Sequence, residues 1–422
     1  MLAYHQAPAY WVPMRFFVTA PLFAALAGLT LVAYGPHALA HRWDPVTLAL
    51  AHLLALGFLA MTMFGALLQL VCVLLAVQPP RLALVAALAH GTLTAGTLAL
   101  AAGFAFGVPW LLHVAQALLA SGVAAFIASV ALALARSQAR TPTLRGIAFS
   151  LIGLALTAAL GLLLAQALAR GIAVPVMRLT AFHAAWGLVG WTFALVASVA
   201  YQVVPLFQFT PPFPPWMLRA LVPGIFALLL AWTVAGSIDA PWASHAVGAC
   251  ESLAALALIV FASTTFALQR RRRRRAPDAT LEFWVLGEAS LAGAGIAFLA
   301  AQAWPDWRQH AAYPLLLGTL MLAGFGMSVV CGMLYKIAPF LTWLHLQRTA
   351  QARASSHARG VVPDKAARRH ARVHAAAIGL LIAAIALPAL ARPAGLLLSL
   401  SSALLAANLY PLVMAYRNAR IA

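Results

Sequence analysis

Thirteen histidines stand in a chain of 422 residues in which only 8% of the residues are charged. His52 opens the apolar segment HLLALGF, and His183 opens HAAWGLVG. Neutral imidazole is a good ligand for haem iron and copper. Ionisable groups within a membrane are costly, so they tend to face the protein interior and to serve a function. These two histidines are therefore candidate cofactor ligands. The alternative is that each imidazole only hydrogen-bonds a backbone carbonyl between helices.

Further histidines extend this candidate site. His90 is a third candidate haem ligand, while His113 and His310 join His183 as candidate copper ligands because all three fall near the outer ends of predicted helices. His345 and His370 fall in predicted loops, where no ligand role is expected. No residue is predicted to be catalytic.

A second group of polar residues could form a proton or polar pathway. Gln69, Gln202 and Lys336 recur at one depth, and Glu288 is a rare acid inside an apolar segment. Lys336 could instead extend to the lipid headgroups or pair with Glu288. Soluble-type hydrolysis and nucleotide hydrolysis are not indicated, because the motifs GxxxxGK[ST], GxSxG and HExxH are absent.

The elements that must position these residues are membrane helices. Apolar residues make up 64% of the chain, more than a soluble fold of this size buries. Twelve segments reach the length of about 20 apolar residues that a membrane helix needs. They are continuously apolar, which excludes the alternating pattern of a β-barrel. The twelve predicted spans are 15–35, 46–76, 82–106, 109–135, 144–169, 179–208, 217–237, 241–268, 281–304, 311–343, 372–391 and 394–416.

The basic residues predict how the spans are oriented. Of the 27 Lys and Arg residues, 21 fall at the chain ends and in loops after even-numbered spans, and 5 fall in the other loops. Because cytoplasmic loops carry the Lys and Arg excess, both termini are predicted to be cytoplasmic, in a bacterial inner membrane. Residues 1–422 form one integral membrane domain with two basic loops, 270–280 and 346–369. The net charge of +19 thus reflects topology and a lipid partner, and no nucleic-acid partner is expected.

An internal repeat links spans 2, 6 and 10. Gly57, Gly190 and Gly324 are each followed by an aromatic residue, at intervals of 133 and 134 residues. The polar residues Gln69, Gln202 and Lys336 follow twelve positions later. Since the repeated spans are four spans apart, they run in the same direction. The sequence therefore predicts an all-α polytopic membrane protein with a pseudo-three-fold arrangement of four-helix units.

This organisation resembles subunit I of the haem-copper oxidase superfamily. The opening RFFVTAPLFAALAGL and the residues around His52 are also similar to NnrS-type membrane proteins, which carry haem and copper and act in nitric-oxide stress in denitrifying bacteria. The resemblance implies haem binding at His52 and copper binding at His183. It does not extend to a complete dioxygen-reducing centre, because span 217–237 and the interior of span 311–343 have no histidine.

Three functions remain open on the sequence alone. The first is a haem- or copper-binding protein of respiratory or nitrogen-oxide metabolism, with an electron-transfer partner. The second is a permease without a cofactor. The third is an accessory or assembly subunit of a membrane respiratory complex that contacts its partner through the loop 346–369.

Overall fold

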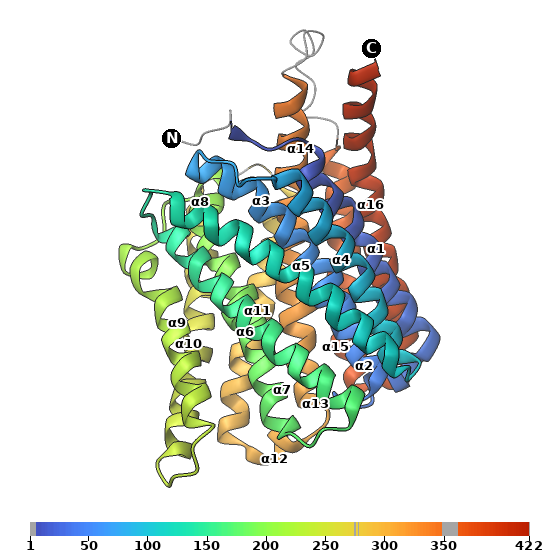
Figure 1. Ribbon diagram of the computed structural model, residues 1–422, viewed down its shortest axis with the longest axis vertical. Helices are drawn as coiled ribbons and strands as arrows, with labels where there is room; N and C mark the ends of the chain where they lie inside the picture. The colour runs from blue at the N-terminus through green and yellow to red at the C-terminus, as the bar shows by residue number, and fades with distance from the viewer. Residues whose placement is uncertain (1–5, 274–275, 277, 348–361, 422) are drawn as a thin grey trace.

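The described part of the chain is a bundle of twelve helical spans, each long and apolar enough to cross a membrane (Figure 1). The computed structural model describes residues 6–273, 276, 278–347 and 362–421, and this part of the chain contains no strand. The predicted all-α polytopic fold is confirmed. Both termini lie at one end of the bundle, called here the termini end, and the short helix α12 (Pro305–Gln309) lies at the other, the α12 end.

The first six spans fill the N-terminal half. Their elements are α1 (Trp11–Tyr34), η2 (Gly35–Leu39), α2 (Pro45–His52), η3 (Leu53–Ala60), α3 (Met61–Leu75), α4 (Leu82–Ala105), α5 (Pro109–Arg136), α6 (Pro142–Arg170), α7 (Val176–Ala185), η4 (Trp186–Phe193) and α8 (Ala194–Gln208). The last six spans are built from α9 (Pro215–Ala235), α10 (Ala243–Arg270), α11 (Ala279–Ala303), α13 (Ala312–Gly318), η5 (Thr319–Met327), α14 (Ser328–Leu346), α15 (Asp364–Ala386), η8 (Pro388–Leu390) and α16 (Ala391–Ile421).

The repeat appears as three π-helical segments. Segments η3, η4 and η5 begin at Leu53, Trp186 and Thr319, at equal intervals of 133 residues. A π segment accommodates an extra residue per turn and is frequent at functional sites. Each of the three contains the repeated glycine and interrupts an otherwise α-helical span. The repeat therefore encodes a shared distortion of the backbone.

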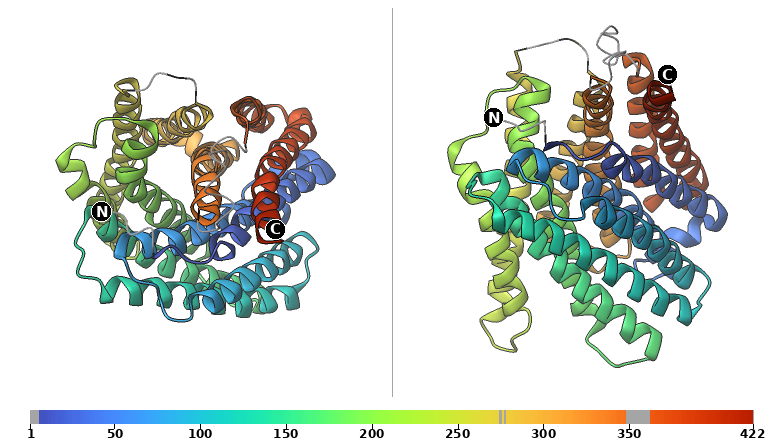
Figure 2. Two further views of the ribbon diagram at one scale, coloured as in Figure 1. Left: turned by 90° about the horizontal axis from the view of Figure 1, so that it is seen from above. Right: turned by 45° about the horizontal axis from the view of Figure 1, so that its top comes forward.

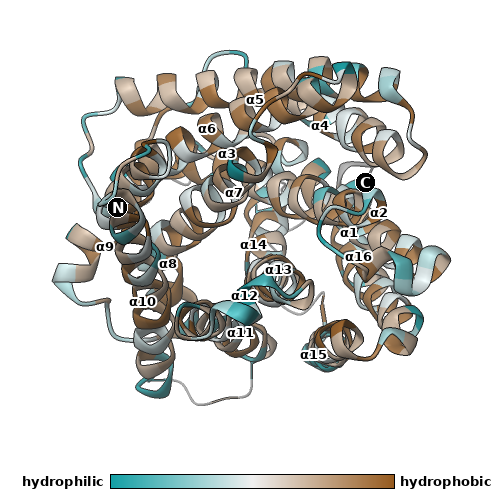
Figure 3. Cartoon of the chain, turned by 90° about the horizontal axis from the view of Figure 1, so that it is seen from below, coloured by the Kyte–Doolittle hydropathy of each residue, from teal (hydrophilic) through white to brown (hydrophobic). Residues whose placement is uncertain are grey.

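The three repeated spans form the centre of the molecule. Their most apolar windows are 83%, 72% and 72% buried, against at most 50% in any other span. Segment η5 packs against both η3 and η4. Viewed along the bundle, α14 lies near the middle of the ring of helices (Figures 2 and 3). The other spans surround these three and are more exposed, toward lipid. The repeated helices therefore occupy the interior of the bundle.

Close helix packing depends on glycine where α1 crosses α16. A Cβ atom at Gly395 would lie 2.6 Å from the carbonyl oxygen of Gly28, so the two backbones touch. Lipid provides no hydrophobic driving force for helices to associate, so membrane helices depend on van der Waals contact. Small residues at such crossings allow that contact.

One boundary differs clearly from the prediction. Helix α15 begins at Asp364, eight residues before the predicted start, so the last residues of the predicted loop 346–369 are helical. Asp364 lies in the first turn and forms an ion pair with Arg368 at 3.0 Å. An acid there favours the helix through its dipole, which a hydropathy criterion does not detect. Residues 348–361 of that loop lie outside the described part of the chain.

Candidate functional site

A cavity of about 1560 Å³ lies between the central helices and reaches the α12 end. Its wall is mostly aliphatic, and the exposed residues His41, Gly171 and His310 line it near the surface. Small-molecule sites of roughly 300–1,000 Å³ are typically apolar with a few placed polar groups. The cavity has this character and a larger volume.

His52 lines the cavity from the end of α2, immediately before η3. Its Nδ1 lies 2.7 Å from the carbonyl oxygen of Leu48. A carbonyl only accepts, so Nδ1 carries the proton and donates. Nε2 then keeps its lone pair and has no hydrogen-bond partner among the described residues.

His183 lines the same cavity from α7 and has the same tautomer. Its Nδ1 donates to the carbonyl of Thr157 in α6 at 3.0 Å. Gly161, one turn further along α6, gives the ring its space, because a Cβ atom there would lie 2.9 Å from His183 Cε1. A hydrogen bond at Nδ1 fixes the orientation of an imidazole and raises the basicity of Nε2.

The two imidazoles are neighbours, with ring centroids 6.1 Å apart and planes inclined by 24°. Two imidazole nitrogens that bind one metal ion from opposite sides, at about 2 Å each, place the ring centroids roughly 6 Å apart. The sequence left open whether His52 and His183 converge, and the structure places their rings side by side at a separation that suits a shared metal ion. Each ring bonds a carbonyl through Nδ1, within its own helix for His52 and between helices for His183, and these bonds leave both Nε2 atoms without a partner among the described residues.

A guanidinium stands at the mouth of this cavity. Arg42 lies in the loop between α1 and α2, half-buried and 4.5 Å from the centroid of the Trp43 ring. Burial lowers the pKa of Arg42 because it disfavours the charged form. No carboxylate in the described residues lies within ion-pair distance of it. Arg42 is thus suited to an anionic group of a ligand.

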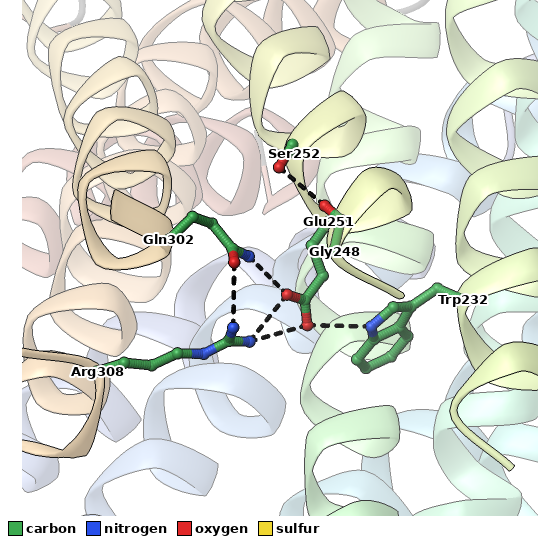
Figure 4. A network of polar contacts seen from close by, with 6 residues as sticks. All are labelled: Trp232, Gly248, Glu251, Ser252, Gln302 and Arg308. Atoms are coloured by element: carbon green, nitrogen blue, oxygen red, sulfur yellow. Dashed lines mark hydrogen bonds and ion pairs between the residues drawn. The ribbon is translucent and has the colours of Figure 1, made fainter. Parts of the chain in front are cut away.

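A second polar group, drawn in Figure 4, contributes Glu251 and Arg308 to the lining of the cavity. Glu251 in α10 accepts hydrogen bonds from Arg308 at 2.8 and 3.0 Å, from Gln302 at 2.7 Å and from the indole of Trp232 at 3.1 Å. Glu251 and Arg308 also line a smaller cavity of about 380 Å³ at the α12 end. The ion pair therefore stands between the large cavity and the small one.

The remaining predicted ligands are not gathered with this pair. His90 bonds Thr19 through Nε2 at 2.9 Å and does not line the cavity. His113 is exposed on α5, also away from the cavity lining. His310 lines the cavity but is exposed, and its Nδ1 accepts from the backbone N–H of Ala312. Within the described residues no three His, Cys, Asp or Glu side chains form a metal-binding group.

The predicted polar pathway is not a hydrogen-bonded chain. Glu288 bonds Gln269 at 2.8 Å, and Lys336 pairs with Asp278 at 2.8 Å, so the suggested pairing of Glu288 with Lys336 is absent. Gln69 is buried, with no partner for its Oε1 in the part of the chain the structure describes. No hydrogen bond joins any two of Gln69, Gln202, Glu288 and Lys336.

Two buried histidines were missed. His370 lies inside α15 and not in a loop, and His370 and His374 are both fully buried. The sequence contained a signal for their burial. His370 and His374 are four residues apart and share one face of the helix, whereas the neighbouring arginines lie on the opposite face. His345, also assigned to a loop, is buried at the end of α14 and bonds the carbonyl of Pro8.

Comparison with known proteins adds no identification to this geometry. No protein-family model matches the chain, and no curated protein matches it.

Proposed function

We propose that the protein binds haem in the large cavity, through the Nε2 atoms of His52 and His183. The observation that carries this proposal is the pair of adjacent imidazoles, each with Nδ1 held by a carbonyl. Haem would need only His52 and His183 from the protein to hold it, because its iron already carries nitrogen ligands of its own. A copper site with three protein ligands finds less support, since the described residues offer no such group.

The surroundings suit an amphipathic cofactor. The aliphatic wall would cover an apolar macrocycle, and Arg42 would pair with a carboxylate substituent at the mouth. An arginine pairs well with carboxylates because its planar fork donates two parallel hydrogen bonds. When bound, iron with two imidazole ligands supplies one-electron transfer.

The biological role proposed is in respiratory or nitrogen-oxide metabolism, in a bacterial inner membrane with both termini cytoplasmic. The resemblance to oxidase subunit I and to NnrS-type proteins motivates this role. The common position of both termini at one end and the basic loops support the orientation. A terminal oxidase activity is not proposed, because histidines for a second metal are missing from α9 and η5.

The test is an oxidised and dithionite-reduced absorption spectrum of the detergent-purified protein, with metal analysis of the same sample. We expect a Soret band that is lost in His52→Ala and in His183→Ala. His113→Ala is the matched control, because His113 is exposed and outside the cavity. Copper without haem would move the proposal to a metal site at His183. Protein free of both, after expression with added haem and copper, would contradict the proposal.

A cofactor-free permease is the second candidate. It is favoured by the two cavities that share Glu251 and Arg308, an arrangement that could admit a solute from the α12 end. Uptake into proteoliposomes that is lost in Glu251→Gln would support it. The accessory-subunit alternative has no structural support, because most of its predicted contact loop lies outside the described residues.

A further inference from the structure

A continuous chain of polar side chains crosses the interface of α14, α15 and α16. The chain, called here the relay, consists of Asn408, Tyr335, His370, Ser401, His374 and Ser328. Its last four members are fully buried, whereas Tyr335 and Asn408 are partly exposed. The relay is separate from the histidine pair in the cavity.

Five hydrogen bonds join the six side chains without a gap. Asn408 donates to the Tyr335 hydroxyl at 2.7 Å, and that hydroxyl lies 2.9 Å from His370 Nδ1. The Ser401 hydroxyl lies 3.0 Å from His370 Nε2 and 3.1 Å from His374 Nδ1. The last bond joins His374 Nε2 to Ser328 at 2.9 Å. Both nitrogens of both imidazoles are therefore used.

The relay has two complete hydrogen-bonding arrangements. In the first, Tyr335 donates to His370 Nδ1, and the donors then run in order through Ser401 and His374 to Ser328. In the second, Ser328 donates to His374 Nε2, and every later bond reverses as far as Tyr335. A neutral imidazole donates from one nitrogen and accepts at the other, and a hydroxyl does both.

The two arrangements keep the same number of hydrogen bonds. The first leaves the hydroxyl proton of Ser328 without an acceptor in the described residues, and the second does the same for Tyr335. Unsatisfied buried groups are costly, and because Ser328 is fully buried whereas Tyr335 is partly exposed, the second arrangement is the more stable one and the first is its higher-energy partner. A network that only stabilised the fold would need one arrangement, whereas proton transfer along the relay requires both.

Conversion of the first arrangement into the second moves one proton. Tyr335 gives its proton to Nδ1 of His370, and Nε2 of the same ring gives its own proton to Ser401. Ser401 in turn gives a proton to Nδ1 of His374. His374 Nε2 passes its proton to Ser328, which releases one beyond the relay. Tyr335 regains a proton from solvent, so one proton enters, one leaves and every group ends neutral.

The ends of the relay lie in suitable places. Tyr335 precedes Lys336, whose ion pair with Asp278 at the start of α11 is about one quarter exposed at the termini end. Ser328 directly follows η5, whose residues Met321 and Leu322 line the cavity. Leu381 of α15 and Leu398 of α16 line it too. Met321 and Leu381 lie seven residues from Ser328 and His374, about 10 Å along a helix, and Leu398 lies three residues from Ser401. All three elements therefore continue from the relay to the cavity.

We propose that this relay conducts protons between the termini end and the cavity. The proposal goes beyond haem binding and does not require it, because the relay is formed by protein side chains alone. The cavity reaches the α12 end, so protein without a cofactor should pass protons across a membrane. A cofactor or substrate in the cavity would receive those protons.

The experiment measures proton entry into proteoliposomes that contain a trapped pH-sensitive dye, driven by a potassium diffusion potential with valinomycin. We use cofactor-free protein, so that failure of haem binding does not affect the result. Wild type is expected to exceed protein-free vesicles. Ser401→Ala, which breaks the relay in its middle, is expected to return the rate to that of protein-free vesicles.

Ser402→Ala is the matched control. Ser402 is the next residue of α16 and equally buried, but it bonds only the carbonyl of Leu398 in its own helix. Tyr335→Phe is the second test variant, because it removes the entrance hydroxyl and keeps the ring that stacks on Phe283. It decides the question if Ser401→Ala does not fold. Wild-type flux no higher than that of empty vesicles, or equal flux in both test variants and the control, would overturn the proposal.

Discussion

The imidazole of His183 is held between a carbonyl and a glycine, and this contact can be tested directly. Gly161→Ala would place a Cβ atom 2.9 Å from Cε1 and 3.3 Å from Nδ1 of the ring. The ring must tilt, which weakens its bond to Thr157. Loss of such supporting contacts typically lowers metal affinity about 10–100-fold. We expect a comparable loss of haem affinity, measured by haem titration of the purified protein.

Gly91→Ala is the control for that substitution. Gly91 also lies in a helix, but no atom lies within 4 Å of the position that its new methyl group would occupy. Alanine there should raise helix stability by up to about 1 kcal/mol and leave haem affinity unchanged. Equal affinities in the two variants would show that Gly161 does not position His183.

Tyr10 joins the N-terminal segment to two distant helices. Its hydroxyl lies 3.3 Å from both Thr342 Oγ1 and the carbonyl oxygen of Leu412. Tyr10→Phe should lower the free energy of unfolding by about 1 kcal/mol for the lost bonding. Thermal unfolding in detergent measures this difference, and Tyr410→Phe is the control because Tyr410 is exposed.

The effect of Tyr10 should depend on pH. Burial raises the pKa of Tyr10 to about 12, from its ordinary value of 10. Because the folded state holds the proton more tightly, this stabilisation is complete below pH 10 and is lost as the pH rises to about 12. The stability difference between wild type and Tyr10→Phe should therefore shrink over that range. A difference that grows there would contradict the assignment.

At the scale of elements, the π segments should tolerate loss of one residue. Removing Ala55 from η3 would restore α-helical geometry locally and keep the flanking helix faces in register. Removing Ala124 from the uninterrupted helix α5 would rotate everything after it by about 100°. Buried Phe126 and Val130 would then turn away from the core. We expect folded, monodisperse protein by size-exclusion chromatography for the first deletion only.

The helices themselves followed from the sequence because lipid imposes a simple rule. A span must be long, apolar and internally hydrogen-bonded, so composition located all twelve. The repeat at Gly57, Gly190 and Gly324 marked three equivalent spans, and the structure adds that these are the central helices. What composition could not give was the start of α15, where Asp364 and its ion pair extend a helix past the apolar segment.

The candidate site was predictable only in part, because helix rotation is set by packing between distant spans. His52 and His183 shared a predicted depth, but whether they faced each other depended on how α2 and α7 pack around the cavity. His113 also fell near an outer helix end and His90 was a further candidate from its helix, yet both face away from the cavity. The relay was hidden for a related reason, since its six members come from three helices and no short motif contains them.

At the scale of the whole molecule, the Glu251–Arg308 ion pair should control access from the α12 end to the large cavity. Cys250 reports on this access, because it lines the cavity and is partly exposed, whereas Cys72 and Cys331 are buried. Glu251→Gln removes the charge that holds Arg308. Such a partly exposed pair contributes up to about 1 kcal/mol, so reaction of Cys250 with a small methanethiosulfonate should become about fivefold faster.

Asp278→Asn is the control for this experiment. It removes an ion pair of the same 2.8 Å length, with Lys336, at the opposite end of the bundle. Modification of Cys250, followed by mass spectrometry, should proceed at the wild-type rate in this variant. If Glu251→Gln also reacts at the wild-type rate, the ion pair does not control access to the cavity, and the entrance lined by Arg42 and His41, in the loop before α2, becomes the next site to test.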